Sequence, residues 1–123
     1  MAVEKLIDRI INHLKGLDEH PEALTYVTEM DREKYRTEAV RYVVAMTGLT
    51  KNTADTRLAG QSRFKSLEIL ALRKSLSLSW DEVQEMFGLD DMKREQLEIL
   101  EQAHDMKGSR SESGANKSEE AYT

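Results

Sequence analysis

Residues 43–58 read VVAMTGLTKNTADTRL, which is the pattern of two short helices that meet at a glycine. Gly48 can adopt the left-handed conformation that ends a helix, and Thr50 can cap the helix that follows. Apolar side chains flank this turn at positions that a helix-turn-helix unit buries. They are Val43, Val44, Leu49, Ala54 and Leu58. The stretch predicts a helix-turn-helix corner, and the rest of the fold can be built outward from it.

An apolar stripe runs along the first predicted helix, residues 3–15, at steps of three and four. Its members are Val3, Leu6, Ile7, Ile10, Ile11 and Leu14. Gly16 then supplies a stop like the one at Gly48. The stripe predicts packing in a core, and the alternative is the interface of a homodimer.

Helix signals continue between these two segments and beyond them. Pro21 suits the first position of a second helix, Asp31 the cap of a third that runs to about Thr47, and Ser62 the cap of a fifth. Further apolar and aromatic positions are expected to face inward. They are Leu24, Val27, Met30, Tyr35, Ala39, Tyr42, Val43, Met46, Phe64, Leu67, Leu70 and Ala71.

Ser79 and Glu82 form the clearest local signal, a capping box at the start of a helix. That helix is expected to end at Gly88, and a last one to run from Asp90 or Asp91 to about Met106. The sequence therefore predicts an all-α fold, a compact bundle of five to seven short helices with helix-turn-helix-like corners. We expect one domain over residues 1–107 and a disordered tail over residues 108–123, where apolar side chains are scarce.

The composition bounds the class of protein. The chain has 123 residues, no cysteine and no apolar run of the roughly 18 residues that a membrane span needs. We expect no disulfides, no membrane association and a cytoplasmic location. The net charge of −5 hides an asymmetry, because residues 36–74 hold eight bases and three acids whereas residues 75–105 hold nine acids and two bases. A basic middle segment leaves nucleic-acid binding open.

The second helix of the corner would present side chains of the types that contact phosphates and base edges in double-stranded DNA. The predicted DNA-binding residues are Lys51, Asn52, Thr53, Thr56, Arg57, Arg63 and Lys65. In this hypothesis the helix lies in the major groove of a DNA site, as in a small transcription regulator or accessory protein. Lys51, Arg63 and Lys65 would hold phosphates, while Asn52, Thr56 and Arg57 would reach base edges. Thr47 and Arg57 depart from the usual apolar pattern, and the alternative is an ordinary corner with a solvated basic face.

A second glycine turn is expected at Gly88, at the end of a stretch made of Glu68–Arg73 and Leu78–Leu89. This stretch resembles region 4 of bacterial sigma factors, and the resemblance stops at the turn. It implies a helix-turn-helix corner around Gly88. The next helix carries acids that would be repelled by phosphates, so it is expected to be a structural corner or an acidic surface for a basic partner. The acidic helices, residues 80–105, thus support an alternative function, a protein-interaction module such as an adaptor or inhibitor.

Catalytic and metal-binding patterns are missing from the sequence. His13, His20 and His104 have no second ligand at helical spacing, and no Gly-rich phosphate loop or nucleophile motif is present. Paired acids such as Asp81 and Glu82 stand where helix caps need them. We therefore expect no enzyme activity, no cofactor and no metal.

Overall fold

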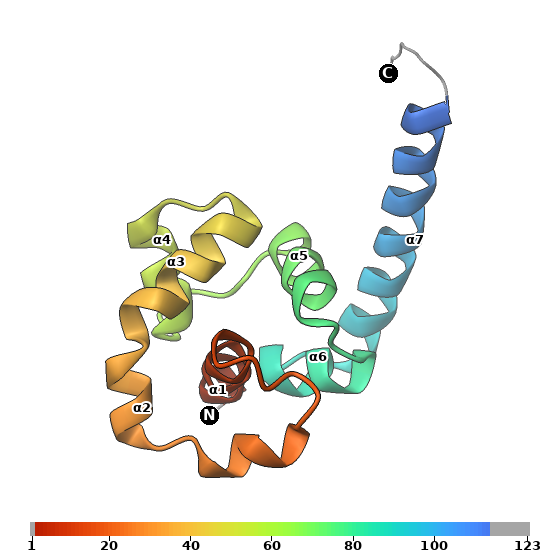
Figure 1. Ribbon diagram of the computed structural model, residues 1–123. Coiled ribbons are helices and arrows are strands. Elements are labelled where there is room, and N and C mark those ends of the chain that lie inside the picture. Colours follow the sequence, from red (N-terminus) through yellow and green to blue (C-terminus); the bar gives the residue numbers. More distant parts are fainter. Residues whose placement is uncertain (1, 114–123) are drawn as a thin grey trace. The chain divides into compact units, whose positions relative to one another are not determined.

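Residues 2–113 are described by a computed structural model, and within them the chain is helical with no strand (Figure 1). The predicted all-α fold is confirmed. The elements in chain order are α1 (Ala2–Leu14), the 3₁₀ helix η1 (Pro21–Tyr26), α2 (Glu29–Lys34), α3 (Arg36–Thr47), α4 (Lys51–Leu58), α5 (Ser66–Leu76), α6 (Trp80–Phe87) and α7 (Asp91–Ser113).

The elements fall into two units, the first ending at Asp90 and the second consisting of α7. The boundary between the two units, after Asp90, lies inside the predicted domain 1–107. A single domain over these residues stays a prediction. Helix α7 continues through residues 108–113, where the sequence predicted the start of the tail. Residues 114–123 of that predicted tail lie outside the described residues.

Helix α1 lies at the centre of the first unit, where it contacts η1 and every helix from α2 to α6 (Figure 1). Leu6, Ile7, Ile10 and Ile11 are all buried there. The apolar stripe therefore forms core, as the first interpretation expected, and these four side chains are not available for a dimer interface. Leu14, at the end of the helix, is 38% exposed.

Local capping explains most helix ends. Ser79 accepts a hydrogen bond from the Glu82 amide, and the Glu82 carboxylate accepts one from the Ser79 amide, at 3.1 and 2.8 Å. This confirms the predicted capping box. Gly48 and Gly88 adopt the left-handed conformation, with φ of 78° and 63°, and end α3 and α6 as expected.

Two predicted caps were wrong. Asp31 is the third residue of α2, and Thr28 is the cap, because the two side chains bond each other's backbone amides in a capping box. Helix α5 begins at Ser66 instead of Ser62, and the Lys65 amide donates to Glu68 Oε1 at 2.9 Å. In each case a nearby carboxylate completes a better cap than the position chosen from the pattern.

Three side chains expected to face inward are exposed. Met30 is 80%, Leu67 57% and Met46 40% exposed. The predicted third helix is also interrupted at Tyr35, which separates α2 from α3. Met30 is exposed because the inner side of this short helix is occupied by an ion pair and not by an apolar contact. Arg32 donates to both oxygens of Asp8 on α1, at 2.8 and 3.1 Å.

Candidate nucleic-acid interface

The turn between α3 and α4 has the local structure of a helix-turn-helix corner. The Gly48 amide donates to the Val44 carbonyl at 2.9 Å, which completes the last turn of α3. Thr50 caps α4 by accepting a hydrogen bond from the Thr53 amide at 3.2 Å. Thr47, which departs from the usual apolar pattern, donates to the Val43 carbonyl and accepts from the Leu49 amide. The Thr47 hydroxyl therefore stabilises the turn through two hydrogen bonds that an apolar side chain at this position could not make.

Buried anchors fix α4 against the rest of the first unit. Ala54 and Leu58 are fully buried, as predicted, and α4 packs against α3 and α1. Val43 on the facing helix is buried as well. On the solvent side of α4, two of the residues predicted to bind DNA are exposed, Lys51 and Asn52.

An ion pair near the surface joins α4 to the start of α3. Arg36 donates to Asp55 Oδ1 at 2.8 Å and to the Asp55 carbonyl at 3.2 Å. The pair matters for any DNA contact, because it neutralises an acid on the exposed side of α4. The sequence analysis did not single out Arg36. Its partner is 19 positions away, so no local spacing signals the pair.

Arg57 does not lie where the DNA hypothesis needs it. Its side chain and that of Glu68 are each only 11% exposed, and Arg57 Nε donates to Glu68 Oε1 at 3.0 Å. A second donor, Nη1, bonds Ser62 Oγ at 2.8 Å. The prediction that Arg57 reads a base edge is therefore corrected. This arginine replaces the usual apolar anchor by an ion pair that ties α4 to α5.

The other predicted site residues divide into two sets. Thr53 and Thr56 are half-buried and bonded within the helix, since the Thr56 hydroxyl donates to the Thr53 carbonyl at 2.8 Å. Four of the residues predicted to contact DNA are exposed, on α4 and on the segment that follows it. They are Lys51, Asn52, Arg63 and Lys65. Arg41 on α3 is also exposed, and the sequence analysis did not include it.

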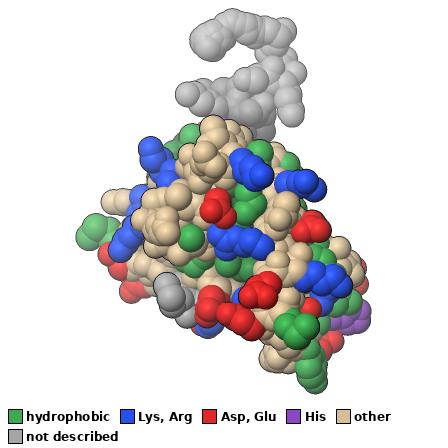
Figure 2. Space-filling view, turned by 90° about the vertical axis from the view of Figure 1, so that its left-hand side faces the viewer, with side chains coloured by type: hydrophobic (Ala, Val, Ile, Leu, Met, Phe, Trp, Pro, Cys, Tyr) green, Lys and Arg blue, Asp and Glu red, His purple; other side chains and the backbone are tan. Residues whose placement is uncertain are grey.

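Figure 2 shows the face of the molecule that α2, α3 and α4 form. Lys and Arg side chains are more frequent in its upper part, towards α4, whereas Asp and Glu side chains gather towards its lower edge. Basic and acidic groups alternate with uncharged ones, so the basic residues do not form a continuous field. A surface of this kind supports a few phosphate contacts instead of a long electrostatic track.

The acids of the two C-terminal helices have partly internal roles. On α6, Glu82 completes the capping box and Glu85 pairs with Lys5 of α1. Within α7, Arg94 donates to Glu98 at 3.0 Å. The acidic helices are therefore not a uniform row of unpaired carboxylates.

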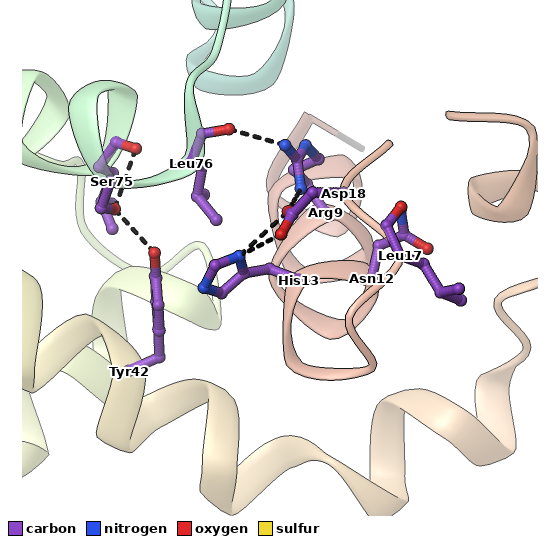
Figure 3. A network of polar contacts seen from close by, with 9 residues as sticks. Arg9, Asn12, His13, Leu17, Asp18, Tyr42, Ser75 and Leu76 are labelled. Carbon is purple, nitrogen blue, oxygen red and sulfur yellow. Dashed lines mark hydrogen bonds and ion pairs between the residues drawn. The ribbon is translucent and has the colours of Figure 1, made fainter. Parts of the chain in front are cut away.

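A second polar cluster connects α1 with its neighbours (Figure 3). The Arg9 side chain, only 9% exposed, donates to Asp18 at 2.7 Å and to the Leu76 carbonyl at the end of α5, also at 2.7 Å. His13 Nδ1 lies 2.8 Å from the same carboxylate. Asp18 thereby fastens the loop after α1 to that helix, and Arg9 joins α1 to the end of α5, so this cluster serves the fold.

Tyr42 continues the cluster from α3. Its hydroxyl donates to Ser75 Oγ at 2.8 Å, and its ring packs edge-on against His13 with 5.2 Å between the ring centres. Burial raises the pKa of Tyr42, against the opposing effect of the Ser75 hydrogen bond. The phenol therefore stays protonated at neutral pH and acts as a donor.

Acid is expected to weaken the fold through Asp18. The hydrogen bond from Arg9, followed by the one from His13, lowers the pKa of this carboxyl below its ordinary value. A lowered folded-state pKa means that the stabilisation is fully present above the unfolded-state pKa of about 3.9 and is lost as the pH falls through the folded value. Urea unfolding of the wild type between about pH 5 and pH 2 should show this loss. The Asp18→Asn variant should be less stable at neutral pH and should show a shallower acid dependence; an identical slope would contradict the assignment.

No group of three or more His, Cys, Asp or Glu side chains among the described residues is placed to hold a metal ion. None of the helices described for residues 2–113 is long and apolar enough to cross a membrane. No protein-family model, curated protein or solved structure matches the chain.

Proposed function

We propose that the protein binds double-stranded DNA through the α3–α4 corner, as a small regulatory or accessory protein. The observation that carries the proposal is the way α4 is held. Buried anchors lie on one side, ion pairs join it to α3 and α5, and exposed Lys51 and Asn52 begin its outer face. A helix fixed in this way presents its first turn to a groove without further ordering cost.

Each site residue has a role in this proposal. Lys51, Arg63 and Lys65 contact phosphates, which positions the protein without reading sequence. Asn52, in the first turn of α4, is the residue that reaches a base edge, because an amide can pair with adenine in the major groove. Thr53 and Thr56 support the helix from within, and Arg57 positions α4 through Glu68.

The test is binding of purified protein to random and selected duplex DNA over a salt series. Affinity is expected to fall with salt, with a slope of about −0.9 for each phosphate contact. The variant Lys51→Glu, Arg63→Glu should lose most of its affinity at low salt. Asn52→Ala should weaken binding to a preferred site more than to random DNA, by roughly tenfold for a lost bidentate contact.

Lys34→Glu serves as a control for the single variant Lys51→Glu, since it makes the same charge change on an exposed residue of α2 outside the corner. It should reduce affinity far less than Lys51→Glu does. Equal losses in the two variants would mean that net charge, not the corner, governs binding.

The alternative is a protein-interaction module that uses the acidic helices, residues 80–105. The favouring observation is that Glu95 on α7 is exposed and adds to the acidic charge of the segment. Electrostatic attraction to DNA is strongest at low salt. If the protein does not bind duplex DNA under that condition, the DNA proposal is wrong and this alternative remains.

A further inference from the structure

The two most exposed large apolar side chains of the first unit lie four residues apart. Tyr26, at the end of η1, is 77% exposed, and Met30, at the start of α2, is 80% exposed. Single exposed apolar residues are common on protein surfaces, but two of them only four positions apart in the sequence are a feature to explain. Neither residue belongs to the α3–α4 corner.

The fold itself turns Met30 outward. Residues two positions apart lie on opposite sides of an α-helix, since each residue advances the helix by about 100°. Arg32 is held on the inner side of α2 by its two bonds to Asp8, and those bonds, with one to Glu29, raise its pKa. Met30 must therefore face solvent for as long as this pair holds.

Acidic residues surround the two apolar side chains in the sequence. Residues 19–34 hold five acids (Glu19, Glu22, Glu29, Asp31 and Glu33) and two bases, a balance of −3 with histidine neutral. Of the two bases, Arg32 is committed to Asp8 and Glu29, and Lys34 lies over the Tyr35 ring. Among the acids, Asp31 is paired with Lys15 at 3.8 Å, whereas Glu22 and Glu33 are exposed.

We infer that the η1–α2 corner, defined by Tyr26, Met30, Glu22 and Glu33, docks a basic amphipathic helix of another protein. Tyrosine and methionine are enriched at protein interfaces, where they bury a large area with adaptable shape. The acids select a partner with Lys or Arg beside its apolar side chains, and they disfavour nucleic acid and anionic membranes. This inference does not depend on the DNA proposal, because the two sites share no residue.

The experiment uses the full chain and a short synthetic helix-forming peptide with Leu on one face and Lys on the other. Fluorescence anisotropy of the labelled peptide should show binding that weakens as salt is added. The variant Tyr26→Ser, Met30→Ser should bind about tenfold more weakly, which corresponds to about 1.4 kcal/mol. Both side chains are exposed, so the far-UV circular dichroism should stay that of the wild type.

Two controls locate the site. Leu67→Ser alters an apolar side chain that is 57% exposed on α5 and should leave the affinity unchanged. A peptide with Glu in place of Lys should not bind, and Glu22→Gln, Glu33→Gln should flatten the salt dependence for the Lys peptide. Amide NMR shifts caused by the Lys peptide should concentrate in residues 22–34. No binding, equal binding of the Glu peptide, or an equal loss in Leu67→Ser would overturn the inference.

Discussion

Replacing Glu68 by Ala is expected to lower the free energy of unfolding by about 3 kcal/mol. Glu68 accepts hydrogen bonds from Arg57 and from the Lys65 amide, and its side chain is almost completely buried. Its removal leaves the buried Arg57 guanidinium bonded to Ser62 but without its carboxylate partner. The substitution also removes the acceptor of the Lys65 amide at the start of α5. Urea unfolding followed by far-UV circular dichroism measures the loss.

The surface pair between Asp55 of α4 and Arg36 of α3 is the matched control. Arg36 and Asp55 are about one-third and one-half exposed, so Asp55→Ala should cost less than about 1 kcal/mol. A double-mutant cycle isolates the buried pair, because Arg57→Ala, Glu68→Ala should be more stable than the sum of the single losses predicts. Strict additivity would mean that the two side chains do not stabilise the fold together.

Shortening Ile10 to Ala is expected to destabilise the protein by about 4 kcal/mol. The side chain has no exposed surface and lies in the middle of α1, which every other element of the first unit contacts. Loss of its outer carbons removes buried apolar area and leaves a cavity that the surrounding helices cannot readily close. Small domains have a total stability of about 5–15 kcal/mol, so the variant should unfold at a much lower urea concentration.

Leu14→Ala is the comparison for this prediction. It removes an aliphatic side chain from the same helix at a position that is 38% exposed, so its cost should be well under half that of Ile10→Ala. Similar losses for the two variants would mean that α1 is not the centre of the core.

The sequence predicted those features that depend on a few neighbouring residues. Spacing within one or two helical turns was enough to predict the Ser79 capping box and the left-handed Gly48 and Gly88. The same kind of spacing predicted the apolar stripe of α1. These signals were sufficient for the all-α fold and for the corner between α3 and α4.

Features set by distant partners could not be predicted in this way. Arg57 is turned inward by a glutamate eleven positions away, and Arg32 by an aspartate twenty-four positions away. Periodicity weighs hydrophobicity and not pairing, so it gives no sign that a charged side chain at either position is held by a distant carboxylate. Met30, expected to face inward, is exposed where Arg32 pairs with Asp8, and a pairing of the same kind holds Arg57 against Glu68 instead of on the exposed side of α4.

The central position of α1 has a consequence for synthesis of the chain. Helix α1 has one of its most extensive contacts with α6, which is synthesised some seventy residues later. Ile10 and Ile11 must therefore wait for Trp80–Phe87 before their surface is covered. A nascent chain that stalls between these helices would carry an uncovered aliphatic stripe, which is the kind of segment that chaperones bind and that aggregates when they are scarce.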